Sequence, residues 1–288
     1  ITKSKNMAGG ILLSSNFLKQ FSKNIDVVSI INKDIRKNKS LNNLIKDKRK
    51  IIFSESFPII LKERFIQTEK NTLSSKKILT LNHFENNLIS KKDENKVFKF
   101  LKSNLKKYDL VIVQDFGHGL INKKIANFLS DNSKFLSLNV QSNSTNFGFN
   151  IINQKFKKAD LFVIDENEIK LFAKERNINF VKSLEDLKNK LNSKYAFLTR
   201  GETYSLLNSK KNKTIKLKAL KDEIVDSVGA GDIFHSMASI LSVSIKNNDH
   251  LILLLSQIAG SIAVTIEGNE RTPTLNEIRN TLNFYLDR

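Results

Sequence analysis

One segment combines residue types and spacing that suit phosphate chemistry: Asp226-Ser227-Val228-Gly229-Ala230-Gly231-Asp232. Apolar residues follow it at helical spacing, at positions Ile233, Phe234, Met237, Ile240 and Leu241. A buried helix is therefore predicted to start near Ala230, which places both glycines at its N-terminus. Unpaired N–H groups and the positive end of the helix dipole favour an anion there. Glycines let a phosphate approach closely because they have no side chain.

Asp232 falls in the first turn of this predicted helix. A carboxylate beside an anion hole can accept the proton of an attacking hydroxyl, while backbone amides stabilise the transferring phosphoryl group. The simpler interpretation is a glycine-rich helix start in which the helix dipole favours an ordinary first-turn acid. The short pattern Gly-x-Gly-Asp leaves both interpretations open.

The rest of the chain must position this segment, and short apolar runs alternate with helical patterns along most of it. Continuous apolar strands separated by helices predict βαβ units and a mostly parallel sheet that is buried on both faces. The expectation is one three-layer αβα domain over residues 1–288. The strand-like runs are 26–31, 59–66, 110–113, 135–140, 161–164 and 196–199, and the helical patterns between them include 94–105, 123–129, 166–173 and 184–191.

The C-terminal third changes character. Residues 204–207 and 214–220 read as two strands of a hairpin around a polar turn. Helices are expected at 230–246, 249–267 and 274–286, the last with Thr274 as its cap and Glu277 three residues later.

Polar side chains lie at or just past the ends of three predicted strands. They are Asp115, Asn139 and Glu168. Ligands of open α/β sheets bind at the carboxyl ends of the strands, so these residues predict a binding site there. A single carboxylate at one strand end is more often a helix cap, but several beside an anion hole favour a ligand site.

The glycine segment closely resembles the Asp-Thr-x-Gly-Ala-Gly-Asp signature of the ribokinase-like (PfkB) carbohydrate kinases, with Ser227 keeping the hydroxyl. The resemblance implies a ribokinase-like fold, ATP as phosphoryl donor and Mg²⁺. It implies that Asp232 is the base and that the amides of Gly229, Ala230 and Gly231 form the anion hole. Asp226 and Ser227 would shape this hole on the nucleotide side, or a nearby site for a monovalent cation (K⁺).

Other family landmarks occur in order and cover nearly the whole chain. Ala8-Gly9-Gly10 resembles the N-terminal Gly-Gly signature, and Ile60-Leu61-Lys62-Glu63-Arg64-Phe65 resembles a lid strand. The strand that ends at Asp115 and the segment 137–150, which contains Asn139, resemble heptose-phosphate-kinase-like domains found fused to cytidylyltransferase domains. The resemblance implies that the acceptor binds at Gly9, Gly10, Arg64, Asp115 and Asn139. It implies that Asp165 and Glu168 organise Mg²⁺, and that Thr199 and Gly201 contact the nucleotide.

The acceptor side departs from the family pattern. Leu13 and Ser14 stand where an Asn is usual, unless Asn16 substitutes for it, and Asp165 replaces another Asn. The chain opens without Met, so we expect one or more N-terminal strands to be missing and the β lid, within about 51–85, to be incomplete. The resemblance further implies a fused cytidylyltransferase domain upstream and a homodimer.

Bulk composition excludes some functions. The 288 residues contain no cysteine, so disulfides and thiolate sites are excluded, and the four histidines lack ligand spacing. A formal charge of +19 raises nucleic acid as a partner. The charge comes mainly from dispersed lysines, so a solvated basic surface is favoured and neither nucleic acid nor membrane is expected as a partner.

The leading prediction is a cytoplasmic kinase acting on a sugar or sugar phosphate. A non-catalytic sugar or nucleotide sensor on the same fold is the alternative, because the acceptor side is altered. A nucleic-acid-binding protein is the third hypothesis, and only the positive net charge supports it.

Overall fold

The computed structural model describes residues 4–7, 9–37, 39–45, 51–68, 75–83, 89–142, 146–210, 214–220, 224–245 and 247–287. Its strands are β1 (Ser29–Asn32), β2 (Ile51–Ser54), β3 (Leu61–Thr68), β4 (Ser75–His83), β5 (Val111–Asp115), β6 (Leu136–Val140), β7 (Leu161–Asp165), β8 (Tyr195–Thr199), β9 (Tyr204–Ser209) and β10 (Ile215–Lys218).

The α-helices are α1 (Ile11–Leu18), α2 (Lys39–Leu44), α3 (Lys91–Asn104), α4 (Lys123–Asn132), α5 (Ile152–Lys155), α6 (Glu166–Ala173), α7 (Phe180–Lys190), α8 (Ala230–Ser244), α9 (Asp249–Val264) and α10 (Leu275–Leu286). Short 3₁₀ helices occupy Lys33–Lys37, Leu105–Lys107 and Glu267–Asn269. No helix in the described ranges is both long and apolar enough to cross a bilayer.

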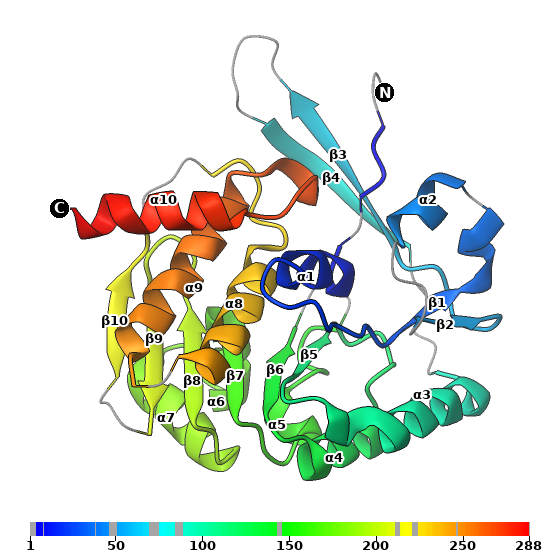
Figure 1. Cartoon of the computed structure of the whole chain (residues 1–288), viewed down its shortest axis with the longest axis horizontal. Coiled ribbons are helices and arrows are strands. Elements are labelled where there is room, and N and C mark those ends of the chain that lie inside the picture. The colour runs from blue at the N-terminus through cyan, green and yellow to red at the C-terminus, as the bar shows by residue number, and fades with distance from the viewer. Residues whose placement is uncertain are drawn as a thin grey trace.

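A six-stranded sheet in the order β10-β9-β8-β7-β6-β5 forms the centre of the molecule (Figure 1). Strands β5 to β8 pair in parallel, and β9 and β10 continue the sheet in antiparallel pairing. The predicted three-layer α/β fold with a mostly parallel sheet is confirmed. The predicted hairpin is β9–β10, and residues 211–213 of its turn lie outside the described residues.

Each face of this sheet is covered by its own helices. One buried cluster joins the sheet to α3, α4, α6 and α7, through residues such as Leu138, Ile169 and Leu184. The other joins it to α1, α8, α9 and α10, through residues such as Phe17, Phe197 and Ile258. Strands β6 and β7 are almost wholly buried, as expected for strands packed on both sides.

Two smaller sheets complete the fold. Strands β3 and β4 form an antiparallel hairpin, with a register shift between Phe65 and Ile66, that projects from the body in Figure 1. Strand β2, at the start of the region expected to hold the lid, instead pairs in parallel with β1. The hairpin is therefore the only lid-like sheet among the described residues of 51–85. The capping box of Thr274 and Glu277 at the start of α10 is present as predicted.

Candidate active site

The start of α8 leaves open space for a ligand. Gly229 is its N-cap, with a left-handed backbone (φ 82°) and no side chain to bond the first N–H groups. A Cβ on Gly229 would lie 2.3 Å from Asn269 Oδ1 and 2.6 Å from Leu13 Cδ2, so only glycine fits there. A Cβ on Gly231 would meet nothing within 4 Å. The exposed Gly231 therefore leaves open space beside the first turn of α8, where a helix N-terminus favours an anion, although the Ala230 N–H already donates to the Ser227 carbonyl at 3.4 Å.

The loop before α8 is held by Asp226. Its carboxylate accepts hydrogen bonds from the Val228 N–H (3.0 Å) and the Gly268 N–H (3.2 Å). Ser227 is exposed beside it. Asp226 thus ties the glycine turn to the segment after α9, which supports a role in shaping the hole.

Asp232 lies in the first turn of α8 and is buried, with 6% of its surface exposed. Gln141 Nε2 donates to its carboxylate at 2.8 Å. Burial raises the pKa of Asp232 to about 7, while the Gln141 hydrogen bond and the charge of Lys62 lower it. A carboxyl group with such a pKa exchanges a proton near neutral pH, as a general base must.

The backbone of Asp232 is fixed as well. Its carbonyl oxygen accepts hydrogen bonds from Ser236 Oγ (2.7 Å) and Gln114 Nε2 (3.3 Å). Gln114 Nε2 also donates to Ser14 Oγ at 2.7 Å, which links α1, β5 and α8. Ser14, at a position where the family pattern has an Asn, therefore helps to fix the backbone of Asp232, whereas Asn16 is exposed on α1.

The predicted site residues Asp115 of β5 and Asn139 of β6 do lie at the same edge of the sheet, but their side chains already form hydrogen bonds or ion pairs within the protein. Asn139 Nδ2 donates to the Val163 carbonyl at 3.1 Å, and its Oδ1 accepts from Gln141 Nε2 at 3.0 Å. Gln141 therefore bridges Asn139 and Asp232. Gln141 was not predicted from the sequence, although it stands two residues after Asn139 and so on the same side of an extended chain.

Asp115 is also bonded within the protein. One carboxylate oxygen accepts from the Gly117 N–H at 3.0 Å, and the other pairs with Lys155 Nζ. Lys155 Nζ donates in addition to Asn150 Oδ1 at 2.6 Å. Asp115 is 3% exposed, so this is a nearly buried ion pair. Neither Lys155 nor Asn150 was predicted from the sequence.

Asp165 and Glu168 form a capping box at the start of α6. Glu168 accepts the N–H groups of Asp165 (2.9 Å) and Ser142 (3.0 Å). Burial, and then the charge of Asp165, raise the pKa of Glu168 to about 8, and burial also raises the pKa of Asp165. A cation would relieve this crowding, so the pair fits a role beside Mg²⁺. No cluster of three or more metal-binding side chains exists among the described residues, but Mg²⁺ bound to phosphates needs only one or two carboxylates.

The predicted nucleotide residues adjoin these carboxylates. Thr199 at the end of β8 pairs in register with Asp165 at the end of β7. A tight turn follows, in which the Arg200 N–H donates to the Tyr204 carbonyl at 3.0 Å. Gly201 has φ 49°, and a Cβ on it would meet nothing within 4 Å, so this turn too leaves open space.

The β3–β4 hairpin brings two cations toward the site. Arg64 lines a cavity of about 180 Å³ with Asp226, Ser227 and Glu267. Lys62 stands two residues earlier on β3, on the same side of the strand. Burial and the nearby Arg64 lower the pKa of Lys62, and the charge of Asp232 partly opposes this. Arg64 was predicted as a site residue from the sequence, whereas Lys62 was not.

Of the predicted Gly-Gly signature, Ala8 lies outside the described residues. Gly10 is the N-cap of α1, with φ 55°, and a Cβ there would lie 3.0 Å from the ring of Phe116. Gly9 has nothing within 4 Å of its Cβ position. Gly10 therefore lets the start of α1 approach Phe116, the residue that follows β5.

Solved structures share this fold. The structure of Arabidopsis thaliana ribokinase complexed with ribose and ATP has a TM-score of 0.73 and 16% identity, covering 98% of this chain and 90% of that one. Phosphofructokinase-2 of Escherichia coli, in complex with potassium, has a TM-score of 0.72 and 11% identity, covering 97% of this chain and 87% of that one.

Curated relatives are longer than this chain. The bifunctional protein HldE of Aliarcobacter butzleri is 24% identical over 284 residues, which cover 96% of this chain and 57% of HldE. HldE of Campylobacter jejuni subsp. jejuni is 24% identical over 188 residues, covering 60% of this chain and 39% of HldE. The match thus spans 57% of the length of the first relative and 39% of the second. The family model of pfkB family carbohydrate kinases matches residues 60–269, so the chain belongs to that family.

Proposed function

We propose that the chain is an ATP- and Mg²⁺-dependent phosphotransferase that acts on a hydroxyl of a sugar or sugar phosphate. The observation that carries this proposal is the start of α8, where the open space at Gly231 lies at a helix N-terminus beside the buried carboxylate of Asp232. Family membership supports the general reaction class, and the residue roles are our inference.

In the proposed reaction, the acceptor hydroxyl oxygen attacks the terminal phosphorus of ATP. The bond from that phosphorus to the bridging oxygen breaks, ADP leaves, and the hydroxyl proton passes to Asp232. The amides of Gly229, Ala230 and Gly231 would stabilise the charge on the transferring group, because they lie at the N-terminus of α8. Gln141 holds the Asp232 carboxylate, so its hydrogen bond favours the ionised, proton-accepting form.

On the donor side, Thr199 and Gly201 would contact the nucleotide, and Asp165 and Glu168 would hold Mg²⁺ through its waters. Bound Mg²⁺ would neutralise charge on the phosphates. Asp226 and Ser227 would shape the hole or an adjacent K⁺ site. The potassium complex of E. coli phosphofructokinase-2 supports testing K⁺.

On the acceptor side, Gly9, Gly10 and Arg64 would contact the sugar. Asp115 and Asn139 stay predicted contacts, and they also hold Lys155 and Gln141. Lys62 and Arg64 place two positive charges on the hairpin that reaches the site. Among candidate acceptors, these charges favour one that already bears a phosphate.

The direct test is release of ADP from ATP over a panel of sugars and sugar phosphates, with and without Mg²⁺. We expect turnover that needs Mg²⁺ and is fastest with a phosphorylated sugar. The alternative, a non-catalytic sensor, is favoured by the occupied side chains of Asp115 and Asn139. It predicts that ligands raise the melting temperature while no ADP forms.

Three further predictions concern a fused domain, a homodimer and the cellular location, and each needs an experiment. The fused cytidylyltransferase domain accords with the bifunctional name of the longer relatives. A homodimer would use the exposed apolar side chains of β4, namely Ile78, Leu79 and Leu81. Sedimentation of the wild type beside Ile78→Glu tests this, because the charge should separate such a dimer. The cytoplasmic location stays a prediction.

A further inference from the structure

A row of polar side chains on β6 faces the helix that carries Asp232. Ser137, Asn139 and Gln141 lie two residues apart, so their side chains point to the same side of the extended chain. Leu138 and Val140 between them belong to the buried cluster on the opposite face of the sheet. The polar row therefore faces α8, which packs on the other face.

Both ends of this row contact α8. Ser137 Oγ lies 2.8 Å from His235 Nε2 and 2.7 Å from Ser239 Oγ. Ser239 Oγ donates in turn to the His235 carbonyl at 2.6 Å. At the other end, Gln141 donates to the Asp232 carboxylate at 2.8 Å, about one helical turn before His235. These contacts form a polar seam between β6 and α8, made of Ser137, Asn139, Gln141, Asp232, His235 and Ser239.

The bonds of the seam determine where the proton of His235 lies. Ser239 uses its only proton on the His235 carbonyl, so Ser137 donates to Ser239. Ser137 is then an acceptor toward the imidazole, and His235 donates to it from Nε2. His235 Nδ1 is buried and bonds no described residue. Burial lowers the pKa of His235 to about 3, so the ring is neutral and its single proton is on Nε2.

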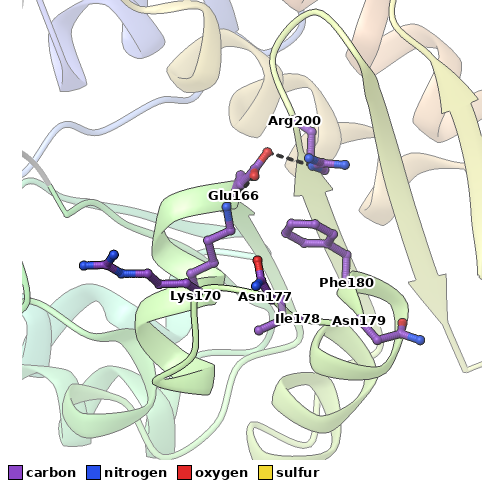
Figure 2. Close-up of a pocket in the computed structure, with 8 residues that line it drawn as sticks. Glu166, Lys170, Asn177, Ile178, Asn179, Phe180 and Arg200 are labelled. Carbon is purple, nitrogen blue, oxygen red and sulfur yellow. Dashed lines mark hydrogen bonds and ion pairs between the residues drawn. The ribbon is translucent and has the colours of Figure 1, made fainter.

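Burial distinguishes the seam from polar contacts at the surface. Arg200 and Glu166 in Figure 2 also join two elements, but their side chains are 21% and 32% exposed, so water competes for the bond. Ser137 and His235 are 0% exposed. A displacement of α8 along β6 would leave both as unpaired polar groups in the core, which is costly. The seam therefore fixes the position of α8 on β6.

We propose that His235 is a positioning residue for Asp232. By fixing α8 on β6 through Ser137, it keeps the Asp232 carboxylate within hydrogen-bond reach of Gln141. Asp232 and His235 lie three positions apart on one face of α8, so a rotation of the helix at His235 moves the carboxylate as well. The inference rests on the proposed function, in which Asp232 is the base. It goes beyond that function by assigning a role to a side chain that is buried away from any substrate.

The test measures the pKa of Asp232 in the free protein, by NMR of labelled aspartate carboxyl carbons over a range of pH. Asp232→Asn assigns the signal. Lys62 of β3 and Glu168 of α6 also interact with this carboxylate through their charges, and none of the variants below changes them.

Two pairs of variants separate positioning from general stability. His235→Leu removes the donor to Ser137, whereas His235→Gln keeps an N–H donor on a side chain of similar reach. Ser137→Ala removes the partner of His235. Ser256→Ala is its matched control, because Ser256 is an equally buried serine of α9 that donates only to its own helix, to the Ile252 carbonyl at 2.7 Å.

We expect His235→Leu and Ser137→Ala to weaken the Gln141 bond and to raise the proton affinity of Asp232 by up to about tenfold, since a hydrogen bond to its charged form is lost. His235→Gln and Ser256→Ala should titrate like the wild type. In Gln141→Leu the bond is already gone, so adding His235→Leu should cause no further change.

The proposal is overturned if His235→Leu and Ser137→Ala lower the melting temperature but leave the pKa of Asp232 unchanged, because the seam would then serve stability alone. It is also overturned if His235→Leu raises that pKa further in Gln141→Leu. If His235→Leu does not fold, Ser137→Ala gives the same decision. The titration needs no turnover, so absence of ADP release by the wild type would count against the proposed function and not against this proposal.

Discussion

The start of α8 and the ends of β5 and β6 face the same site but are built in opposite ways. At α8 the chemistry is offered by the backbone, and Gly231 leaves the space in front of it unfilled. At β5 and β6 the polar groups are side chains, and Asp115 and Asn139 already bond Lys155 and Gln141. The difference predicts that the start of α8 can bind the phosphoryl group without rearrangement. On the acceptor side, by contrast, the polar side chains are held by other side chains of the protein. The following predictions test this contrast.

The largest effect is expected at Gly231. Changing Gly231→Ala places a methyl group in the open space at α8, so phosphoryl transfer should fall by about 100-fold. The free energy of unfolding should not fall, since alanine is favoured in a helix. Gly229→Ala is the matched comparison, because it should cost about 2 kcal/mol of stability through its positive φ and its contacts with Asn269 and Leu13.

Rates of ADP release and urea unfolding of both variants check this prediction. If Gly231→Ala keeps full activity, the open space at α8 is not the phosphate site.

At the ends of β5 and β6, the main effect should be on stability. Asp115→Asn removes the charge that pairs with Lys155 in a nearly buried position, so unfolding should become easier by about 3 kcal/mol. Asp131→Asn, at an exposed position of α4, is the control and should be neutral. Denaturant unfolding measures both. An unchanged stability for Asp115→Asn would mean that the ion pair does not support this part of the site.

The β3–β4 hairpin should affect recognition of the acceptor more than its rate of reaction. Lys62→Ala should raise KM for a phosphorylated sugar roughly tenfold, through loss of one charged contact, and change KM for an unphosphorylated sugar much less. Lys99→Ala, an exposed change on α3, should alter neither. Steady-state kinetics with the two acceptors decide the point. An equal rise for both would argue against phosphate recognition by Lys62.

Gln141 joins the two regions, and its loss should give the smallest change. Transfer requires ionised Asp232, so kcat/KM should rise with pH through the pKa of about 7 that burial gives this group. The Gln141 hydrogen bond lowers that pKa, so Gln141→Leu should move the rise to higher pH. Gln154→Leu, exposed on α5, serves as the control. A shift to lower pH would show that Gln141 does not stabilise the carboxylate.

The contrast also explains what the sequence could predict. The anion hole and Asp232 lie within seven consecutive residues, so composition and helical spacing locate them. The parallel strands and long helices were predictable because their apolar patterns are continuous. Strand β2 and the short helix α1 were missed, because elements of so few residues carry little pattern.

The partners on the acceptor side could not be found in this way. Lys155 is 40 residues from Asp115, and Gln141 is 91 residues from Asp232. Only the packing of α5 and α8 against the sheet brings these residues together, and no local spacing encodes that. Lys62 was missed for a related reason, since the course of the hairpin toward Asp232 is a tertiary feature.

In the proposed mechanism, α8 carries phosphoryl transfer and Asp232 is its base. The decisive experiment measures transfer of a radiolabelled terminal phosphate from ATP to the acceptor in a single turnover, by the wild type and by Asp232→Asn. We predict that the wild type labels the acceptor, whereas Asp232→Asn still binds ATP but transfers label at least about 1,000-fold more slowly. Asp186→Asn, exposed on α7, should match the wild type. Label transfer by Asp232→Asn at the wild-type rate would show that Asp232 is not the base.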